Sequence, residues 1–305
     1  MKILAINYSQ TGQLDDIITN FLSSIKNCEI DRIKIQTVSP FSFPWTVSNF
    51  YNAMPETVLE EGIPLKEITF KEEKYDLIIL GYQPWFLSPS RPTTALLQLE
   101  SFQKRMKNTK IITVIGARNM WLNAQESVVN YISKADGELI GNLAFIDKAP
   151  NNLSAISIVH WMLTGKKTKK WGIFPLPGIS DEDIINASIF GEILNNSIET
   201  NHYDDLQDKF ISKKGVQVFV NILFIEGKAK KIFNIWAKII REKEKQGRKR
   251  SLWISFFRFY LNFALFIVAP ILLALYTILI RPLRINYIKV QKDHYLYLGI
   301  ENGEH

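Results

Sequence analysis

The chain of 305 residues has few of the side chains that bind metals or form disulfides. Its single cysteine, Cys28, excludes an internal disulfide and a thiolate cluster, which suits a reducing compartment. Its four histidines, at positions 160, 202, 294 and 305, show no metal-ligand spacing, so we predict no metal site. No charged and then apolar leader follows Met1, so we expect no secretory signal.

Acidic residues are scarce in the last third of the chain. Residues 1–210 carry 20 Lys and Arg against 24 Asp and Glu, a net charge of −4, whereas residues 211–305 carry 17 against 6, a net charge of +11. The net charge of +7 therefore belongs to the C-terminal region. Such a region fits a polyanionic partner, either nucleic acid or a lipid surface.

A long apolar run decides between these two partners. From Phe259 to Ile280 the chain has no ionisable group except tyrosine hydroxyls, and as a helix this run is about 33 Å long, enough to cross a bilayer core of about 30 Å. We therefore predict lipid rather than nucleic acid as partner, with a membrane-anchoring helix over residues 251–282 and a basic tail over 283–305. Flanking Lys and Arg are denser on the N-terminal side, which places the preceding domain in the cytoplasm. A hairpin that enters one leaflet stays open.

A basic amphipathic helix precedes the apolar run. From Lys228 onward, apolar side chains fall largely on one helical face, opposite lysines and Arg241. This pattern is typical of a helix that lies on an anionic membrane surface. We place it in a basic connecting region over residues 201–250.

The N-terminal stretch has the pattern of a phosphate site. Residues 2–8 form an apolar run typical of a buried parallel strand, and residues 14–25 repeat apolar side chains at helical spacing. The loop between them has two hydroxyls, one glycine, two amides and no carboxylate. Unpaired N–H groups and the positive dipole end of the helix favour an anion there. A polar turn that merely opens a helix is the alternative.

This loop lacks the lysine of a P-loop and the three glycines of a Rossmann fingerprint. It resembles the phosphate loop of flavodoxins, Ser/Thr-x-Thr-Gly-x-Thr, which holds the phosphate of FMN. Leu14 stands where that pattern ends in threonine. The resemblance implies FMN as cofactor, with a phosphate site formed by Ser9, Gln10, Thr11, Gly12, Gln13 and Leu14.

Further buried strands alternate with helices, which predicts a parallel sheet. We expect strands at residues 30–38, 75–81, 109–116 and 139–146, the last ended by Asp147 to Pro150. The predicted fold is a flavodoxin-like, doubly wound, five-stranded α/β domain over residues 1–200 with strand order 2-1-3-4-5. It includes an aromatic insertion at 39–62, either a lid over an apolar ligand or a small satellite core, and a helical extension at 150–200.

Two more loops leave carboxyl ends of these strands, where ligands bind in such sheets. They resemble the flavodoxin loops that border the isoalloxazine ring, which needs an apolar or aromatic wall and a few donors. The resemblance implies that the ring contacts Gln83, Pro84, Trp85 and Phe86 of the first loop and Gly116, Ala117, Arg118, Asn119 and Trp121 of the second.

The order of features resembles one flavodoxin-like family, the dialkylresorcinol condensing enzymes of bacterial flexirubin and aryl-polyene pigment clusters. The segments that carry this resemblance are residues 8–14, 43–45, 80–85, 116–121, 160–167, 172–175 and 177–183. It implies FMN-dependent aromatisation of a hydrophobic 2,5-dialkyl-cyclohexane-1,3-dione, supplied by a ketosynthase-like partner, at the cytoplasmic face of the inner membrane. His160 and Tyr82 are the candidates that assist the proton step.

Two other functions fit the same residues. One is a membrane-anchored flavodoxin-type electron carrier or quinone reductase. The other is a non-catalytic docking subunit for the ketosynthase, which keeps the fold but not the flavin. A yellow purified protein excludes the docking subunit, and oxidation of the dione distinguishes the aromatase from the carrier.

Overall fold

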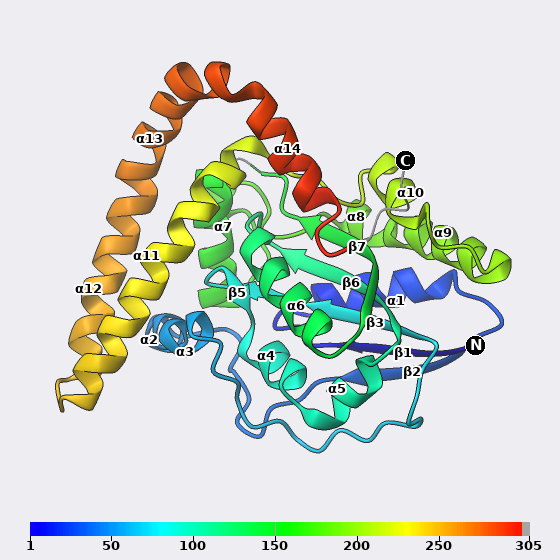
Figure 1. Ribbon diagram of the computed structural model, residues 1–305. Helices are drawn as coiled ribbons and strands as arrows, with labels where there is room; N and C mark the ends of the chain where they lie inside the picture. The colour runs from blue at the N-terminus through cyan, green and yellow to red at the C-terminus, as the bar shows by residue number, and fades with distance from the viewer. Residues whose placement is uncertain (150, 301–305) are drawn as a thin grey trace.

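The computed structural model describes residues 1–149 and 151–300, and its centre is a five-stranded parallel sheet (Figure 1). The strand order is β2-β1-β3-β6-β7, which confirms the predicted order 2-1-3-4-5. A separate two-stranded sheet pairs β4 (Pro84–Trp85) with β5 (Ser88–Pro89). The strands of the main sheet are β1 (Lys2–Asn7), β2 (Glu29–Lys34), β3 (Leu77–Tyr82), β6 (Lys110–Ala117) and β7 (Glu138–Ile146).

The central strands are buried on both faces, as their continuous apolar runs predict. One face packs against α1 (Gln13–Ser23), α8 (Asp181–Ile185), α9 (Ala187–Thr200) and α10 (Leu206–Ser212). The other face packs against α4 (Arg91–Leu97), α5 (Glu100–Met106) and α6 (Leu122–Lys134). The helical extension predicted for residues 150–200 includes α8 and α9, two helices joined at Asn186.

The edge strand β7 contains a bulge next to Gly141. Ile111 pairs with Leu139 and Ile112 with Gly141, so Ile140 is the extra residue. A Cβ atom at Gly141 would lie 3.0 Å from the ring of Phe210. Glycine therefore lets α10 pack closely on this strand.

The sheet domain continues beyond residue 200, where we predicted a connecting region. Leu206 and Phe210 are fully buried in the core on one face of the sheet, and Val216 and Val218 are buried in the core on the other face. Their apolar side chains lie in short segments without a clear period, so the sequence did not reveal them. The true start of the C-terminal region is α11 (Val220–Lys245), which begins eight residues before the predicted helix.

Part of the apolar face of α11, for which we predicted a membrane contact, is covered by protein, while Ile235 on that face is 57% exposed. Ala237 and Ile240 are fully buried against α3 (Met54–Val58) of the aromatic insertion and against Phe257 of the antiparallel helix that follows. The charged side chains close this junction, because Arg250 donates to both carboxylate oxygens of Glu56, at 2.7 and 2.8 Å. The insertion and the C-terminal helices therefore form one packed unit (Figure 1).

The predicted anchor forms most of a continuous helical stretch, Arg250–Leu296. This stretch is long and apolar enough to cross a membrane, and almost none of its most apolar segment is buried. Two segments with π-helical turns lie within it, and each precedes a proline, Pro270 or Pro282, whose ring displaces carbonyls of the preceding turn. Its parts are α12 (Arg250–Phe263), η2 (Ala264–Val268), α13 (Ala269–Leu275), η3 (Tyr276–Ile280), η4 (Arg281–Arg284) and α14 (Ile285–Leu296).

This stretch does not project away from the domain but runs alongside α11 and turns back to the sheet through α14 (Figure 1). The ring of Tyr276 stacks on that of Phe224 in α11, with the ring centroids 4.0 Å apart. Beyond the turn, the Tyr295 hydroxyl donates to Glu126 at 2.6 Å, and Gln207 donates to the Leu296 carbonyl at 2.7 Å. Pro150 and the last five residues of the predicted basic tail lie outside the described residues.

Candidate functional site

The three loops identified in the sequence meet at the carboxyl ends of β1, β3 and β6 around a cavity of about 220 Å³. We call it the upper cavity. Its lining includes ten of the predicted cofactor-binding residues, namely Gln10, Thr11, Gln13, Gln83, Pro84, Trp85, Phe86, Gly116, Ala117 and Arg118. The remaining lining residues are Trp45, Phe50, Ile158, Trp161, Met162, Gly178 and Ile179.

One end of the upper cavity is the N-terminus of α1. Gly12 precedes the helix with a φ of 88°, and no side chain caps the first turn. The first N–H groups of the helix therefore have no partner within it. A Cβ built on Gly12 meets nothing within 4 Å, and the Gly12 N–H donates to Ser9 Oγ at 3.1 Å. The loop is an open turn that exposes N–H groups and the side chain of Thr11.

Two residues of the predicted phosphate loop contribute differently from expectation. The side chain of Gln13 is occupied by the backbone of Ile179, donating to its carbonyl at 2.8 Å and accepting from its N–H at 3.2 Å. The side chain of Leu14 is fully buried in the core, because it lies on the face of α1 that packs on the sheet. For both residues only the backbone N–H remains available to an anion.

Asp15 is a carboxylate in the first turn of α1, where it can oppose a phosphate. Its oxygens are held by other groups: Asn7 donates to it at 2.7 Å, and Arg32 and Lys34 pair with it at 3.5 and 3.4 Å. These cations offset its charge. The first turn therefore keeps its capacity for an anion.

The second loop supplies an aromatic wall. Trp85 packs edge to face against Trp45 and Phe41 of the insertion, with ring centroids 5.3 and 5.0 Å apart. The side-chain oxygen of Gln83 accepts from the Gln10 N–H at 2.8 Å, which ties this loop to the first. The insertion thus closes one side of the cavity through Trp45 and Phe50, while its residues Met54 and Val58 pack in a separate core with α11 and α12.

The turn between β4 and β5 has two successive non-glycine residues in the left-handed region, Phe86 with φ of 47° and Leu87 with φ of 65°. Such a conformation persists only where the surroundings enforce it. Lys230 of α11 donates to the Leu87 carbonyl at 3.1 Å and to Ser88 Oγ at 2.8 Å. The C-terminal region therefore holds a loop of the site in place.

Trp45 contributes a donor that the protein leaves unused. Its side chain is 4% exposed and lines the upper cavity, and its indole N–H has no hydrogen-bond partner within the part of the chain that the structure describes. A buried donor without a partner costs about 1–3 kcal/mol. An acceptor on a bound ligand can remove this cost.

The third loop brings Arg118 to the cavity. Burial lowers the pKa of its guanidinium to about 10, while the charges of Asp147 and Glu226 oppose this shift, so the group is cationic at neutral pH. Asp147 also accepts from Ser154 Oγ at 2.7 Å and from the Gly178 N–H at 3.3 Å. It therefore joins α7 (Asn151–Thr164) to the loop that forms the opposite wall.

The other predicted site residues do not line the upper cavity. Trp121 is 1% exposed and packs in the core, and Asn119, two residues before it, is also buried. Ser9 and Gly12 shape the turn without lining the cavity. The planar or polar character of Trp121 and Asn119 fits a ligand-binding loop as well as it fits a core position. For this reason the sequence alone predicted them as cofactor-binding residues.

The two proton-transfer candidates lie elsewhere. Tyr82 is fully buried, its hydroxyl donates to Gln125 at 2.7 Å, and burial raises its pKa well above 10. His160 is half-buried on α7 and is not among the residues that line the cavity. The structure thus places neither side chain against a ligand in this cavity.

Sequence reasoning missed the wall made by α7 and the loop after it, Ile158, Trp161, Met162, Gly178 and Ile179. The apolar period of α7 was visible, but the side chains that face the cavity have the same apolar character as core residues. It also missed Glu226 of α11. This carboxylate is fully buried, and its Oε1 accepts from the Asn123 N–H at the start of α6 at 2.9 Å.

Glu226 gives a testable pH dependence. Burial raises its pKa to about 7, above its value in the unfolded chain, although the N–H groups of α6 lower it. Its contribution to stability is therefore complete below about pH 4.5 and is lost as the pH rises to about 7, by roughly 3 kcal/mol. We expect the free energy of unfolding of Glu226→Gln, measured by denaturant titration, to lose this part of the dependence. The exposed Glu242→Gln on the same helix should keep the wild-type profile, and identical profiles for all three proteins contradict the assignment.

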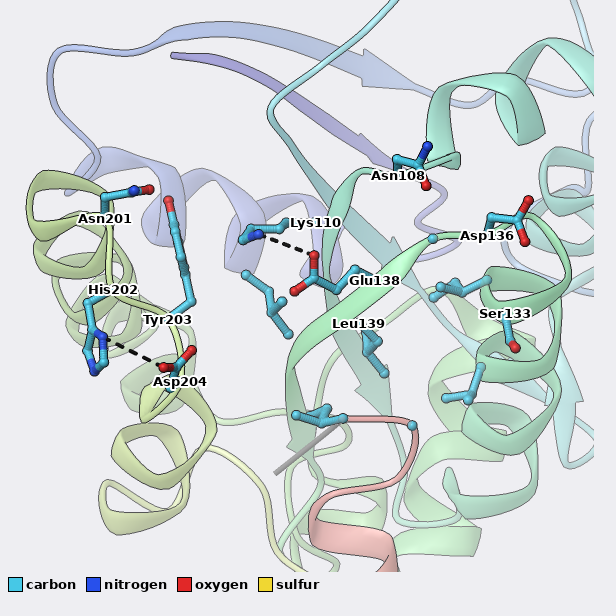
Figure 2. A pocket seen from close by; sticks show the side chains of 16 residues that line it. Asn108, Lys110, Ser133, Asp136, Glu138, Leu139, Asn201, His202, Tyr203 and Asp204 are labelled. Carbon is cyan, nitrogen blue, oxygen red and sulfur yellow. Dashed lines mark hydrogen bonds and ion pairs between the residues drawn. The ribbon is translucent and has the colours of Figure 1, made fainter. Parts of the chain in front are cut away.

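A larger cavity, of about 780 Å³, lies at the opposite end of the sheet. Figure 2 shows its polar lining around the starts of β6 and β7, where Lys110 pairs with Glu138 at 3.2 Å. Ligands of open parallel sheets bind beyond the carboxyl ends of the strands, so we place the functional site in the smaller, upper cavity. Among residues 1–149 and 151–300, no group of three or more His, Cys, Asp or Glu side chains can hold a metal ion.

The strand order and the three loops at its carboxyl edge define a flavodoxin-like α/β protein. The chain is similar to a flavoprotein in complex with FMN from Lactobacillus acidophilus, with 16% identity, a TM-score of 0.39 and coverage of 46% of this chain and 91% of that one. It is also similar to oxidised flavodoxin 1 from Bacillus cereus, with 14% identity, a TM-score of 0.32 and coverage of 63% and 95%.

A third similar structure is a flavone reductase, with 13% identity, a TM-score of 0.36 and coverage of 67% of this chain and 65% of that one. No protein-family model matches the chain, and no match was found among curated proteins. At these levels of identity and TM-score the fold assignment rests on the strand order of the chain itself.

Proposed function

We propose that the upper cavity binds FMN and that the protein is a flavin-dependent oxidoreductase. The observation that carries this proposal is the convergence of an uncapped helix N-terminus, an aromatic wall and a half-buried cation in one cavity. Thr11 and the first N–H groups of α1 would hold the phosphate. Trp85 and the loop at Gly116 and Ala117 would border the ring. When bound, FMN supplies an acceptor for two electrons.

The reaction we propose is the aromatisation of a 2,5-dialkyl-cyclohexane-1,3-dione to a dialkylresorcinol. It would remove two hydrogens from the ring, one of them as a proton to solvent, and bound FMN would supply the acceptor for the other hydrogen and its electron pair. No carboxylate or histidine is among the described residues that line the cavity. A 1,3-dione is acidic enough to bind as its enolate, which the guanidinium of Arg118 stabilises, while the indole N–H of Trp45 can donate to a ring oxygen. A ketosynthase-like partner that supplies the dione belongs to the same proposal.

Two measurements test this proposal. The purified protein should be yellow, and its flavin should stay bound through gel filtration. Under anaerobic conditions the dione should bleach the flavin band and give one resorcinol for each flavin. Bleaching by NAD(P)H but not by the dione would instead identify an electron carrier or quinone reductase, and a colourless protein that takes up no FMN would leave only a docking subunit.

We also propose that the protein lies on the cytoplasmic face of the inner membrane with α12 and α13 in the plane of the bilayer. The apolar stretch is largely exposed, with Phe259 and Ile278 at 74% and 70%. Both ends of the stretch contact the sheet domain or its insertion, through Arg250 with Glu56 of α3 and through Tyr295 with Glu126 of α6. A helix that crosses the bilayer would have to separate these ends, so this packing favours an in-plane arrangement over a span.

A further inference from the structure

A second, smaller cavity lies next to the upper cavity. Its volume is about 150 Å³, and it is a partly open depression lined by α2 (Val47–Asn52), α7 and α12. Apolar side chains of α7, Val159 and Leu163, line it. We call it the side cavity. It has room for roughly five groups the size of a water molecule, at about 30 Å³ each.

The two cavities share a wall. Phe50 of α2 and Met162 of α7 line both of them. Met162 is unbranched, so its side chain can change rotamer to admit a ligand at modest cost. A ligand with a polar ring in the upper cavity can therefore extend an apolar substituent past this wall into the side cavity.

The other end of the side cavity is formed by α12. Arg258 and Asn262 line it there, and both are exposed. They lie on the same helix as the exposed apolar side chains Phe259 and Phe263. The side cavity thus lies between the upper cavity and the apolar surface of the C-terminal helices.

We propose that the side cavity holds an alkyl chain of the substrate, and that the chain enters from the lipid-facing surface past Arg258 and Asn262. This inference rests on the proposed function, since it places the ring of the same substrate in the upper cavity. The polar mouth suits an entry at the level of lipid head groups, and the apolar interior suits a hydrocarbon. The substrate class is accordingly a cyclic 1,3-dione with at least one chain of several carbons.

The test measures how affinity depends on chain length. The probes are 5-alkylresorcinols with chains from methyl to hexyl, and binding is followed by tryptophan fluorescence with and without FMN. Each methylene buried in an apolar site is worth about a fourfold gain in affinity. We expect this gain in the wild type, and we expect Leu163→Trp and Val159→Phe, which fill the side cavity, to reduce it to less than twofold for each methylene.

Leu153→Trp is the matched control, because Leu153 is exposed on the same helix and does not line the side cavity. It should keep the wild-type dependence on chain length. The proposal is overturned if affinity depends on chain length equally in the control and in both filling variants. It is also overturned if the affinity of the wild type does not depend on chain length. A protein that takes up no FMN but keeps the dependence supports the alkyl site and contradicts the proposed reaction.

Discussion

Thr11→Asp is expected to weaken FMN binding at least a hundredfold while changing riboflavin binding only a few-fold. Thr11 lines the upper cavity beside the uncapped first turn of α1, where the phosphate would lie. A carboxylate there faces the phosphate at close range, and at an effective dielectric constant of about 20 the repulsion is about 3 kcal/mol or more. Riboflavin lacks the phosphate, so its affinity should report only the loss of the threonine side chain.

The control for this prediction is Thr19→Asp, the same substitution at an exposed position two turns along α1. It should leave both affinities unchanged, as measured by flavin fluorescence titration of the apoprotein. Equal loss of FMN and riboflavin in Thr11→Asp would point to damage to the loop, and unchanged FMN binding would place the phosphate elsewhere.

The sheet could be predicted because its signals are local. Each central strand is an apolar run followed by a polar loop, and parallel strands with short loops allow few strand orders. Because three of the loops follow the carboxyl ends of parallel strands, we could predict that they meet at one edge of the sheet without knowing any distance between their residues. For this reason Gln10, Gln83 and Arg118 could all be predicted at one edge of the sheet, where they line one cavity.

Side-chain direction could not be predicted in the same way. Trp121 and Tyr82 lie within or beside predicted loops but point into the core, since a one-residue change along a strand or turn reverses the facing direction. Leu14 departs from the flavodoxin pattern because its side chain packs on the sheet, while its backbone N–H keeps its place in the first turn. A substitution that weakens a motif in sequence can therefore leave the backbone part of the site intact.

The C-terminal region shows the same limit at a larger scale. Its helices were visible as patterns, but their partners come from segments about 180 residues away in sequence, such as α3 packed on α11. Those contacts cover part of the face of α11 that the sequence assigned to lipid, and more of the exposed apolar side chains lie on the helices that follow it. We therefore propose the membrane contact for α12 and α13, where exposed apolar side chains are more numerous than on α11.

Outside the site, the largest effect is expected on membrane binding, from a triple substitution on this surface: Phe259→Glu, Ile271→Glu and Ile278→Glu. Each replaces an apolar side chain that is at least half exposed, so each loses about 2 kcal/mol of burial in lipid and adds the cost of a charge near hydrocarbon. We expect the triple variant to leave the vesicle fraction almost completely in flotation with phosphatidylglycerol vesicles, with its flavin content unchanged. The matched control places glutamate at Val38, Ile173 and Ile185, which are equally exposed elsewhere, and should float like the wild type.

Labelling of single cysteines then separates an in-plane helix from a span. In a Cys28→Ser background, Arg248→Cys lies before the apolar stretch and Asp293→Cys lies after it, and both positions are exposed. Because both ends of the stretch pack against the same domain, a membrane-impermeant maleimide should label both cysteines from the cytoplasmic side. Labelling of position 293 only from the opposite side would require α14 to leave Glu126 and Gln207, and the helix would then cross the bilayer.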